Sequence, residues 1–201
     1  MVAMPRINLL PQRLPANIGD GIGRGVGRLG VTPNMISLFA FGGNVVAAYL
    51  VGREAVRWAG VIYLIFSLLD LVDGAVARAK GLASVFGAIF DSVLDRASEV
   101  LVLVGCGYYF AERGENVQVV VAYTALFGSV AVSYMRARAE AAGLSMREGL
   151  FRRQERVALV GLGLLFNGLT VVIWLLALLS NATAVQRFVM LIRGLRTAPE
   201  S

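Results

Sequence analysis

The stretch from Asp70 to Asp95 decides the fold of this chain and reads DLVDGAVARAKGLASVFGAIFDSVLD. It follows directly on the apolar run 58–69, WAGVIYLIFSLL. Ionisable groups are expensive to place in a membrane, and those found there generally serve a function. The stretch therefore raises two linked questions: whether the run spans a membrane, and what the carboxylates bind.

The composition favours an integral membrane protein. Of 201 residues, 57% are hydrophobic and 16% charged, and the mean hydropathy of +0.71 is too high for a soluble domain of this size. A membrane-spanning helix needs roughly 20 apolar residues. Five runs reach about that length and a sixth is shorter. We therefore predict an all-α integral membrane protein with six transmembrane helices, at about 33–52, 56–77, 84–111, 117–136, 154–167 and 169–192.

Two segments need separate interpretation. Residues 16–29 carry an apolar stripe beside a charged one, which predicts an amphipathic helix lying in the membrane interface, although their glycines also suit a loose loop. We expect residues 1–30 to be a cytoplasmic juxtamembrane segment without a cleavable signal peptide, and residues 1–201 to form one domain. Phe166-Asn167-Gly168 is either a tight turn between the last two helices or a kink within one longer element.

The basic residues predict the orientation in the membrane. Fifteen of the 19 Lys and Arg residues fall on the side of the membrane that holds both termini, and only Arg53, Arg57 and Arg113 fall on the other. This asymmetry predicts a multi-pass protein of the cell membrane whose termini and 70–78 segment face the cytoplasm. Anchoring to anionic headgroups explains many of these cations. It does not explain why six crowd between residues 136 and 156.

The missing residue types limit the chemistry. The sequence has no histidine, and its single cysteine, Cys106, lies within an apolar run. An intrachain disulfide and a cysteine metal cluster are therefore excluded. Proton transfer and metal binding must fall to carboxylates, which favour Mg²⁺ over zinc.

Helical periodicity places the carboxylates on two stripes. Asp70 and Asp73 share one face of their helix, and Asp91 and Asp95 share a face of the next. A short turn near residues 80–81 lets the two stripes face each other as an antiparallel hairpin near the cytoplasmic surface. Four neighbouring negative charges need compensation. Two magnesium ions would supply it and would clamp a pyrophosphate for in-line phosphoryl displacement.

Two other interpretations of the aspartates stay open. They could pair with arginines such as Arg78 and Arg96 to hold helices together. They could also line a cation pathway, as in a transporter. The pathway does not account for Gly74, Ala77 and Gly87, small residues on the same faces that leave room for a flat nucleotide near the helix backbones.

The spacing D-x2-DG-x2-AR-x8-G-x3-D-x3-D, which this stretch matches at every fixed position, resembles the signature of the CDP-alcohol phosphotransferase family. The resemblance implies transfer of a substituted phosphate from a CDP-linked lipid to an alcohol, with release of CMP, by a homodimer. It also implies that two metal ions bind Asp70, Asp73 and Asp91, and that Asp95 both contributes to the metal site and acts as general base. It further implies that the CDP moiety contacts Gly74, Ala77, Arg78 and Gly87.

A second resemblance concerns the acceptor. The segments 133–144 (SYMRARAEAAGL), 153–156 (RQER) and 186–187 (QR) are similar to a pattern of the actinobacterial phosphatidylinositol-phosphate synthases and their archaeal ether-lipid relatives. Arg136 stands where that pattern has lysine, and Gln154 where it has proline.

The charges independently favour an acceptor that carries a phosphate. Arg136, Arg156 and Arg187 should all lie on the cytoplasmic side, and the fork of a guanidinium matches phosphate oxygens. Together with these charges, the two resemblances imply an enzyme that transfers the phosphatidyl group of CDP-diacylglycerol to inositol phosphate, with two Mg²⁺ ions or Mn²⁺ as cofactor. Glycerol 3-phosphate fits the charge equally, so a phosphatidylglycerol-phosphate synthase is the alternative.

Overall fold

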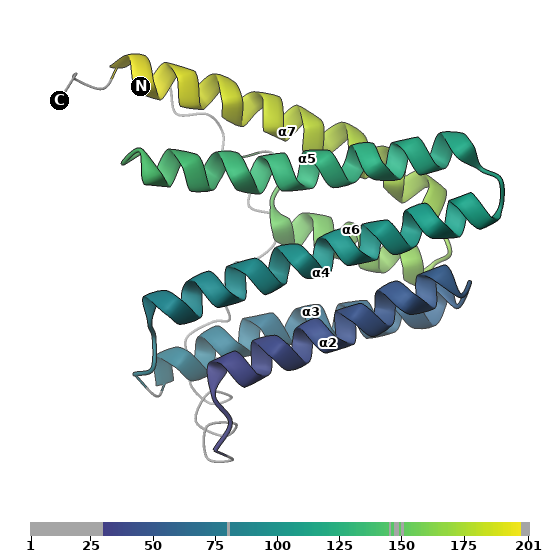
Figure 1. The fold of residues 1–201 in the computed structure, drawn as a ribbon, viewed down its shortest axis with the longest axis horizontal. Helices are drawn as coiled ribbons and strands as arrows, with labels where there is room; N and C mark the ends of the chain where they lie inside the picture. The colour runs from purple at the N-terminus through teal and green to yellow at the C-terminus, as the bar shows by residue number, and fades with distance from the viewer. Residues whose placement is uncertain (1–29, 80, 145, 147–148, 150, 198–201) are drawn as a thin grey trace.

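The structure, a computed structural model, describes residues 30–79, 81–144, 146, 149 and 151–197. As predicted for an all-α protein, these residues contain no strand (Figure 1). The predicted interfacial helix at 16–29 lies outside the described residues. Those residues form six helices: α2 (Pro33–Gly52), α3 (Val56–Ala79), α4 (Val85–Glu112), α5 (Asn116–Ala141), α6 (Arg153–Leu165) and α7 (Leu169–Thr197).

Local sequence explains where α2 and α4 begin. The Thr32 side chain caps α2 by accepting a hydrogen bond from the backbone N of Met35 at 3.4 Å, and Pro33 occupies the first turn. The Ser84 hydroxyl caps α4 in the same way, accepting from the backbone N of Gly87 at 3.0 Å. Between α3 and α4 the chain turns at Gly81, whose φ of +64° suits glycine.

The junction of α6 and α7 is a tight turn. Helix α6 ends at Leu165 and α7 begins at Leu169, with Asn167 between them at a φ of +58°. Asparagine is one of the few residues that adopts this left-handed conformation readily. The alternative of a kink within one longer helix is therefore wrong.

The helices differ in their suitability for crossing a membrane. Among the described residues, four helices are long and apolar enough to span: 33–52, 56–78, 116–141 and 169–195. Helix α4 is long enough but carries Asp91, Asp95, Arg96 and Glu99. Helix α6 has 13 residues, or about 20 Å at 1.5 Å per residue, less than the hydrocarbon thickness of about 30 Å. The described residues thus form six helices near the predicted positions, and four of these have the character of full spans, so the count of six transmembrane helices stays a prediction.

Helix α2 joins the two aspartate-bearing helices. It packs against both α3 and α4, while α5 packs on α4 and α7, and α6 on α3 and α7 (Figure 1). Helices α3 and α4 run antiparallel, as predicted, but in the described part of the chain they are not among the pairs that pack closely along their lengths. Side chains from α2 and α6 therefore reach the carboxylates that α3 and α4 carry.

Small residues bring the helix backbones together. A Cβ atom at Gly105 would lie 2.6 Å from the carbonyl oxygen of Ala48, and one at Gly60 would lie 2.5 Å from the backbone N of Leu165. Close approach through small residues is how helices associate in membranes, where burial of apolar surface supplies little driving force. The core includes the buried residues Val51, Tyr63, Phe110, Leu164 and Ile173, which come from five of the helices.

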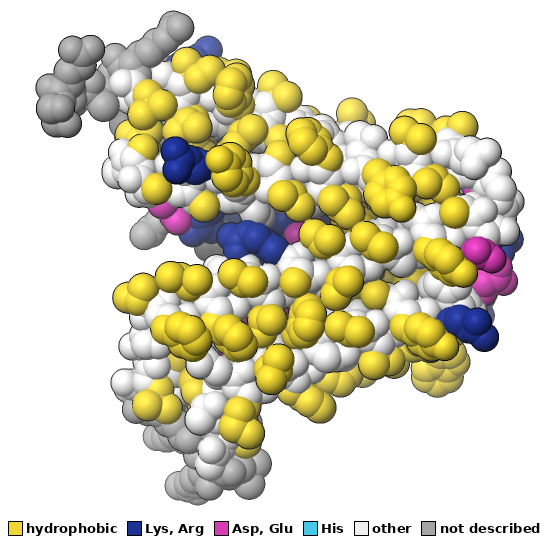
Figure 2. Space-filling view, viewed as in Figure 1, with side chains coloured by type: hydrophobic (Ala, Val, Ile, Leu, Met, Phe, Trp, Pro, Cys, Tyr) yellow, Lys and Arg dark blue, Asp and Glu magenta, His cyan; other side chains and the backbone are white. Residues whose placement is uncertain are grey.

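The outer surface is apolar, and charges gather in a hollow. Large apolar side chains face outward, among them Phe39, Trp58, Phe127 and Leu178, each at least 65% exposed. Such a surface suits contact with lipid. Figure 2 shows Lys or Arg side chains together with acidic ones inside the hollow between α4 and α5.

Candidate active site

Four aspartates from two helices come together near the ends of α3 and α4 that meet at the turn. Asp70 and Asp73 lie one turn apart on α3, and Asp91 and Asp95 one turn apart on α4. The carboxyl groups of Asp73 and Asp91 are close enough to interact electrostatically, and so are those of Asp70 and Asp95. The structure thus brings together the four carboxylates that helical spacing grouped.

Two side chains from other helices contact this cluster. The Ser37 hydroxyl on α2 donates a hydrogen bond to Asp73 Oδ2 at 2.5 Å, and both side chains are buried. Arg153, the first residue of α6, lies between two aspartates: its Nη2 is 2.7 Å from Asp70 Oδ2 and 2.6 Å from Asp95 Oδ1. Sequence reasoning assigned no role to Ser37 or Arg153.

The donor atoms of this cluster suit a hard divalent cation. Asp91 Oδ1 is buried and has no hydrogen-bond partner in the structure. An unpaired buried carboxylate oxygen is unfavourable, and a cation relieves it. Carboxylate oxygens are the ligands that Mg²⁺ and Mn²⁺ prefer. Across the described ranges, no three acidic or cysteine side chains already surround one point as a finished metal site does. The oxygen atoms of these side chains therefore suit a divalent cation as ligands. In the structure, the Arg153 guanidinium lies between two of the four carboxylates, those of Asp70 and Asp95.

The small residues of the motif line the same ends of the two helices. Gly74 and Ala77 are half-buried on α3, and Arg78 is exposed at its end. A Cβ atom at Gly74 would lie 3.3 Å from Arg78 Nη1, and one at Gly87 would lie 3.4 Å from Asn34 Oδ1. Side chains at these positions would narrow the space beside the aspartates.

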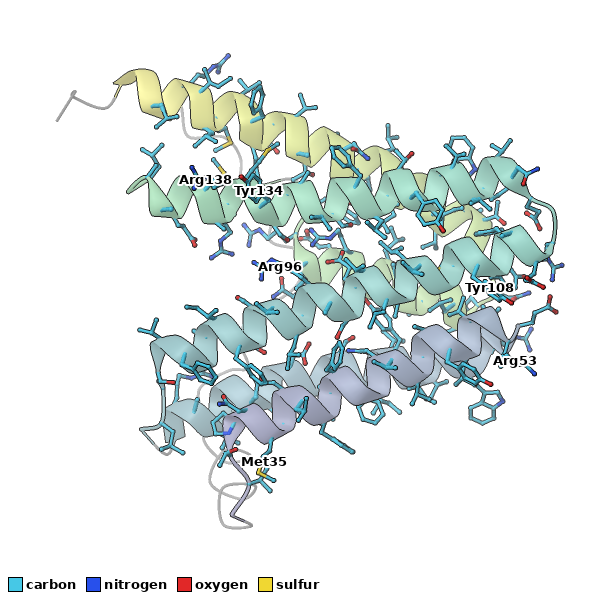
Figure 3. All side chains as sticks on the ribbon, viewed as in Figure 1. Met35, Arg53, Arg96, Tyr108, Tyr134 and Arg138 are labelled. Atoms are coloured by element: carbon cyan, nitrogen blue, oxygen red, sulfur yellow. The ribbon has the colours of Figure 1, made fainter. Side chains whose placement is uncertain are left out.

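A cavity of about 240 Å³ adjoins the aspartate cluster, because Asp95 forms part of its wall. Figure 3 shows Arg96 reaching from α4 toward the space between α4 and α5. Ser92 of α4, three residues each of α5 and α6, Arg152 just before α6 and one arginine of α7 complete the wall. The lining residues are Ser92, Asp95, Arg96, Val132, Ser133, Arg136, Arg152, Arg153, Gln154, Arg156 and Arg187.

All three arginines predicted to bind the acceptor line this cavity, in different states. Arg136 is about half exposed and pairs with Glu140 one turn on, Nε to Oε1 at 2.9 Å. Arg187 is 5% exposed, and its Nη1 donates to the carbonyl oxygen of Val132 at 2.7 Å. Arg156 is 2% exposed. Two of the three guanidiniums, those of Arg156 and Arg187, are thus buried, and that of Arg136 is the accessible one.

Glu99 holds Arg156, and sequence reasoning missed it. Arg156 Nε lies 2.5 Å from Glu99 Oε1, and Nη2 lies 3.0 Å from Oε2. The signal for Glu99 was its position one turn beyond Asp95 on α4, which continues the acidic face. Arg152, Arg153 and Ser133 were also missed as lining residues, although the first two belong to the crowded arginine segment.

Comparison with known proteins gives one family. A family model described as CDP-alcohol phosphatidyltransferase matches residues 30–194. The phosphatidylinositol phosphate synthase of Mycobacteroides abscessus is 34% identical over 95% of this chain and 89% of its own. The archaetidylinositol phosphate synthase of Pyrococcus horikoshii is 36% identical over 84% of this chain and 87% of its own.

Solved structures agree with the sequence matches. The crystal structure of Mycobacterium tuberculosis phosphatidylinositol phosphate synthase with CDP-DAG bound superposes with a TM-score of 0.82 at 31% identity, covering 91% of this chain and 96% of the other. The same enzyme in complex with manganese and citrate gives a TM-score of 0.79 at 31% identity, covering 90% of each chain. The aspartate motif, the helical fold and these matches agree: the chain belongs to the CDP-alcohol phosphatidyltransferase family.

Proposed function

We propose that this protein transfers the phosphatidyl group of CDP-diacylglycerol to a hydroxyl of inositol phosphate, giving phosphatidylinositol phosphate and CMP. One observation carries the proposal: Asp95 belongs both to the four-aspartate cluster and to the wall of a cavity lined by arginines. A group that activates the acceptor hydroxyl must lie close to both the diphosphate and the acceptor, and the position of Asp95 between the aspartate cluster and the cavity supports that role. The names of the bacterial relatives support the substrates.

The aspartate cluster is the proposed metal site. Asp70, Asp73, Asp91 and Asp95 would hold two divalent cations, Mg²⁺ by preference, and the manganese complex of the mycobacterial enzyme supports a divalent requirement. When bound, the cations would offset the charge of the diphosphate and of the leaving CMP.

The chain's own residues would then carry out the remaining steps. Asp95 accepts the proton of the acceptor hydroxyl as that oxygen forms its bond to the phosphorus bearing the diacylglycerol. The bond from this phosphorus to the bridging oxygen of the diphosphate breaks, and CMP leaves. Gly74 and Gly87 leave room for the nucleotide, with Ala77 and Arg78 beside it.

The acceptor would lie in the arginine-lined cavity. Arg136, Arg156 and Arg187 would bind its phosphate, since converging guanidiniums need an anion. Glycerol 3-phosphate offers the same anion and is the alternative acceptor. Membership of the family makes the chain an enzyme of this type, so a cation transporter is not a competing proposal. We further propose that the protein is a homodimer of the cell membrane with its active site facing the cytoplasm.

An acceptor panel tests the assignment. Purified protein with CDP-diacylglycerol and Mg²⁺ would be given labelled inositol phosphate, free inositol and glycerol 3-phosphate, and product lipid and CMP would be measured. We expect turnover with inositol phosphate and very little with free inositol. A clear preference for glycerol 3-phosphate would replace the inositol assignment with the phosphatidylglycerol-phosphate alternative.

A further inference from the structure

Arg153 belongs to two sites at once. Its Nη2 contacts Asp70 on α3 and Asp95 on α4, at 2.7 and 2.6 Å. The same side chain lines the cavity with Arg136 and Arg187. Because Arg153 is the first residue of α6, its backbone is fixed while its long side chain keeps several rotatable bonds. One flexible cation thus stands on the boundary between the aspartates and the acceptor cavity.

Arg153 competes with a divalent cation for the same oxygens. The lone pairs of Asp70 Oδ2 and Asp95 Oδ1 that accept from Nη2 are those a divalent cation would use. A guanidinium about 3 Å from these oxygens and a divalent cation bound to them would also repel each other strongly in a partly buried site. Metal binding at these two aspartates therefore requires the guanidinium to move away.

The Arg153 guanidinium can move into the cavity whose wall it already forms. Its presence there is favourable only when the cavity also holds an anion. The wall already holds the guanidiniums of Arg96, Arg152 and Arg187, beside Arg156, whose charge Glu99 offsets. A further cation among them is unfavourable unless a phosphate or a similar anion lies between them.

We propose that Arg153 couples the metal site to the acceptor site: Asp70 and Asp95 hold it until metal binds, and it then turns to the acceptor's phosphate. This inference rests on the proposed metal and acceptor sites. It makes metal and acceptor reinforce each other's binding by the same factor, as linkage requires. Arg153 also occupies Asp95, the proposed base, until metal binds.

Manganese binding tests the coupling without turnover. Mn²⁺ affinity of the purified full chain in detergent would be measured by electron paramagnetic resonance, with and without sulfate. Sulfate is chosen because it is a tetrahedral dianion like phosphate but complexes Mn²⁺ only weakly in solution. For the wild type, we expect sulfate to tighten Mn²⁺ binding by a factor in the range of about 5 to 150. Absence of a sulfate effect in the wild type overturns the proposal.

The decisive variant is Arg153→Gln. It should bind Mn²⁺ more tightly than the wild type without sulfate, because the competing cation is gone, and sulfate should no longer change its affinity. A purely structural role for Arg153 would weaken Mn²⁺ binding instead, and that result overturns the proposal, as does a sulfate effect of wild-type size. Arg96→Gln is the matched control: it removes the same charge from the same cavity, but Arg96 bonds to the carbonyl of Ser92 on its own helix. It should keep the sulfate effect.

Two further measurements keep the outcome interpretable. If Arg153→Gln does not fold, Arg153→Lys decides: its shorter ammonium group should give a smaller sulfate effect than wild type, and an equal effect overturns the coupling. Asp91→Asn separates the proposals, since it should lose Mn²⁺ binding whether or not the coupling exists. If the wild type and Asp91→Asn bind Mn²⁺ equally, the metal assignment itself fails, and the coupling fails with it.

Discussion

Glu99 on α4 and Arg156 on α6 form a buried ion pair with two parallel hydrogen bonds, Nε to Oε1 at 2.5 Å and Nη2 to Oε2 at 3.0 Å. Glu99 is 7% exposed and Arg156 2%. The third donor group of Arg156, Nη1, lies 3.5 Å from the carbonyl oxygen of Phe151. The pair fixes the orientation of the Arg156 guanidinium in the cavity wall, and Glu99 itself lies one helical turn from Asp95 on α4. It therefore links the stability of the fold to the geometry of the proposed acceptor site.

The first prediction concerns this pair. Glu99→Gln leaves the charge of Arg156 buried without a carboxylate, and removing one partner of a buried pair costs about 3–5 kcal/mol. We expect a lower free energy of unfolding and a higher KM for the acceptor, because Arg156 is no longer held in place. Thermal unfolding in detergent and steady-state kinetics measure the two effects.

The control for this prediction is an exposed pair. Arg113 Nη1 lies 3.4 Å from Glu54 Oε1, with side chains 44% and 60% exposed. Exposed pairs contribute about 0–1 kcal/mol, so Glu54→Gln should leave both the unfolding temperature and the KM nearly unchanged. Equal effects of the two substitutions would show that burial gives Glu99 no special role.

The second prediction concerns the divalent cation. Because four neighbouring carboxylates need compensation, activity should be lost in excess EDTA and return on addition of Mg²⁺ or Mn²⁺. Asp91→Asn removes one charge from a site in which Asp91 Oδ1 has no protein partner. It should abolish turnover and weaken CDP-lipid binding. Full turnover in excess EDTA is the result that the metal assignment cannot accommodate.

The third prediction separates binding from chemistry at Asp95. Asp95→Asn keeps a polar side chain of the same shape, and three aspartates remain for the metal. CDP-lipid affinity should stay within roughly tenfold of wild type, while kcat should fall by at least the ~10²-fold typical of general-base catalysis. Binding and single-turnover assays on one preparation make the comparison. Near-normal turnover would mean that the proton leaves by another route.

Local sequence carried the information for the aspartate cluster and for several helix boundaries. Asp70 and Asp73, like Asp91 and Asp95, are placed on one face by helical periodicity alone. The start of α2 is also a local feature, because Thr32 caps it and Pro33 occupies its first turn. The choice at Asn167 stayed open because its sequence suits both a turn and a kink, and the left-handed φ decides it.

The partners of the aspartates depend on packing between distant segments. Arg153 meets Asp70 across 83 residues, and Glu99 meets Arg156 across 57. No periodicity within one helix relates such positions, since they depend on how α6 packs against α3 and how its side chains reach α4. The same packing explains why Arg156, predicted as a free phosphate ligand, is already held by a carboxylate.

The last prediction concerns Arg136, the most accessible of the three proposed acceptor arginines. It lines the cavity, is about half exposed, and in the described part of the chain its carboxylate partner is Glu140. Arg136→Gln should therefore leave the unfolding temperature and CDP-lipid binding nearly unchanged. A charge-assisted hydrogen bond contributes about 1.5–3 kcal/mol, so kcat/KM for inositol phosphate should fall roughly ten- to a hundredfold, mainly through KM. Arg136→Lys keeps the charge and should retain most of the activity.

Arg138 supplies the matched control for Arg136. It lies two residues further along α5 (Figure 3), is exposed and is not part of the cavity wall. Arg138→Gln removes the same charge from the same helix, so it reports any general effect of charge on substrate attraction. We expect its kcat/KM to stay near wild type. If Arg136→Gln behaves like Arg138→Gln, Arg136 does not contact the acceptor's phosphate, and the cavity's buried guanidiniums, Arg156 and Arg187, must bind it without help from α5.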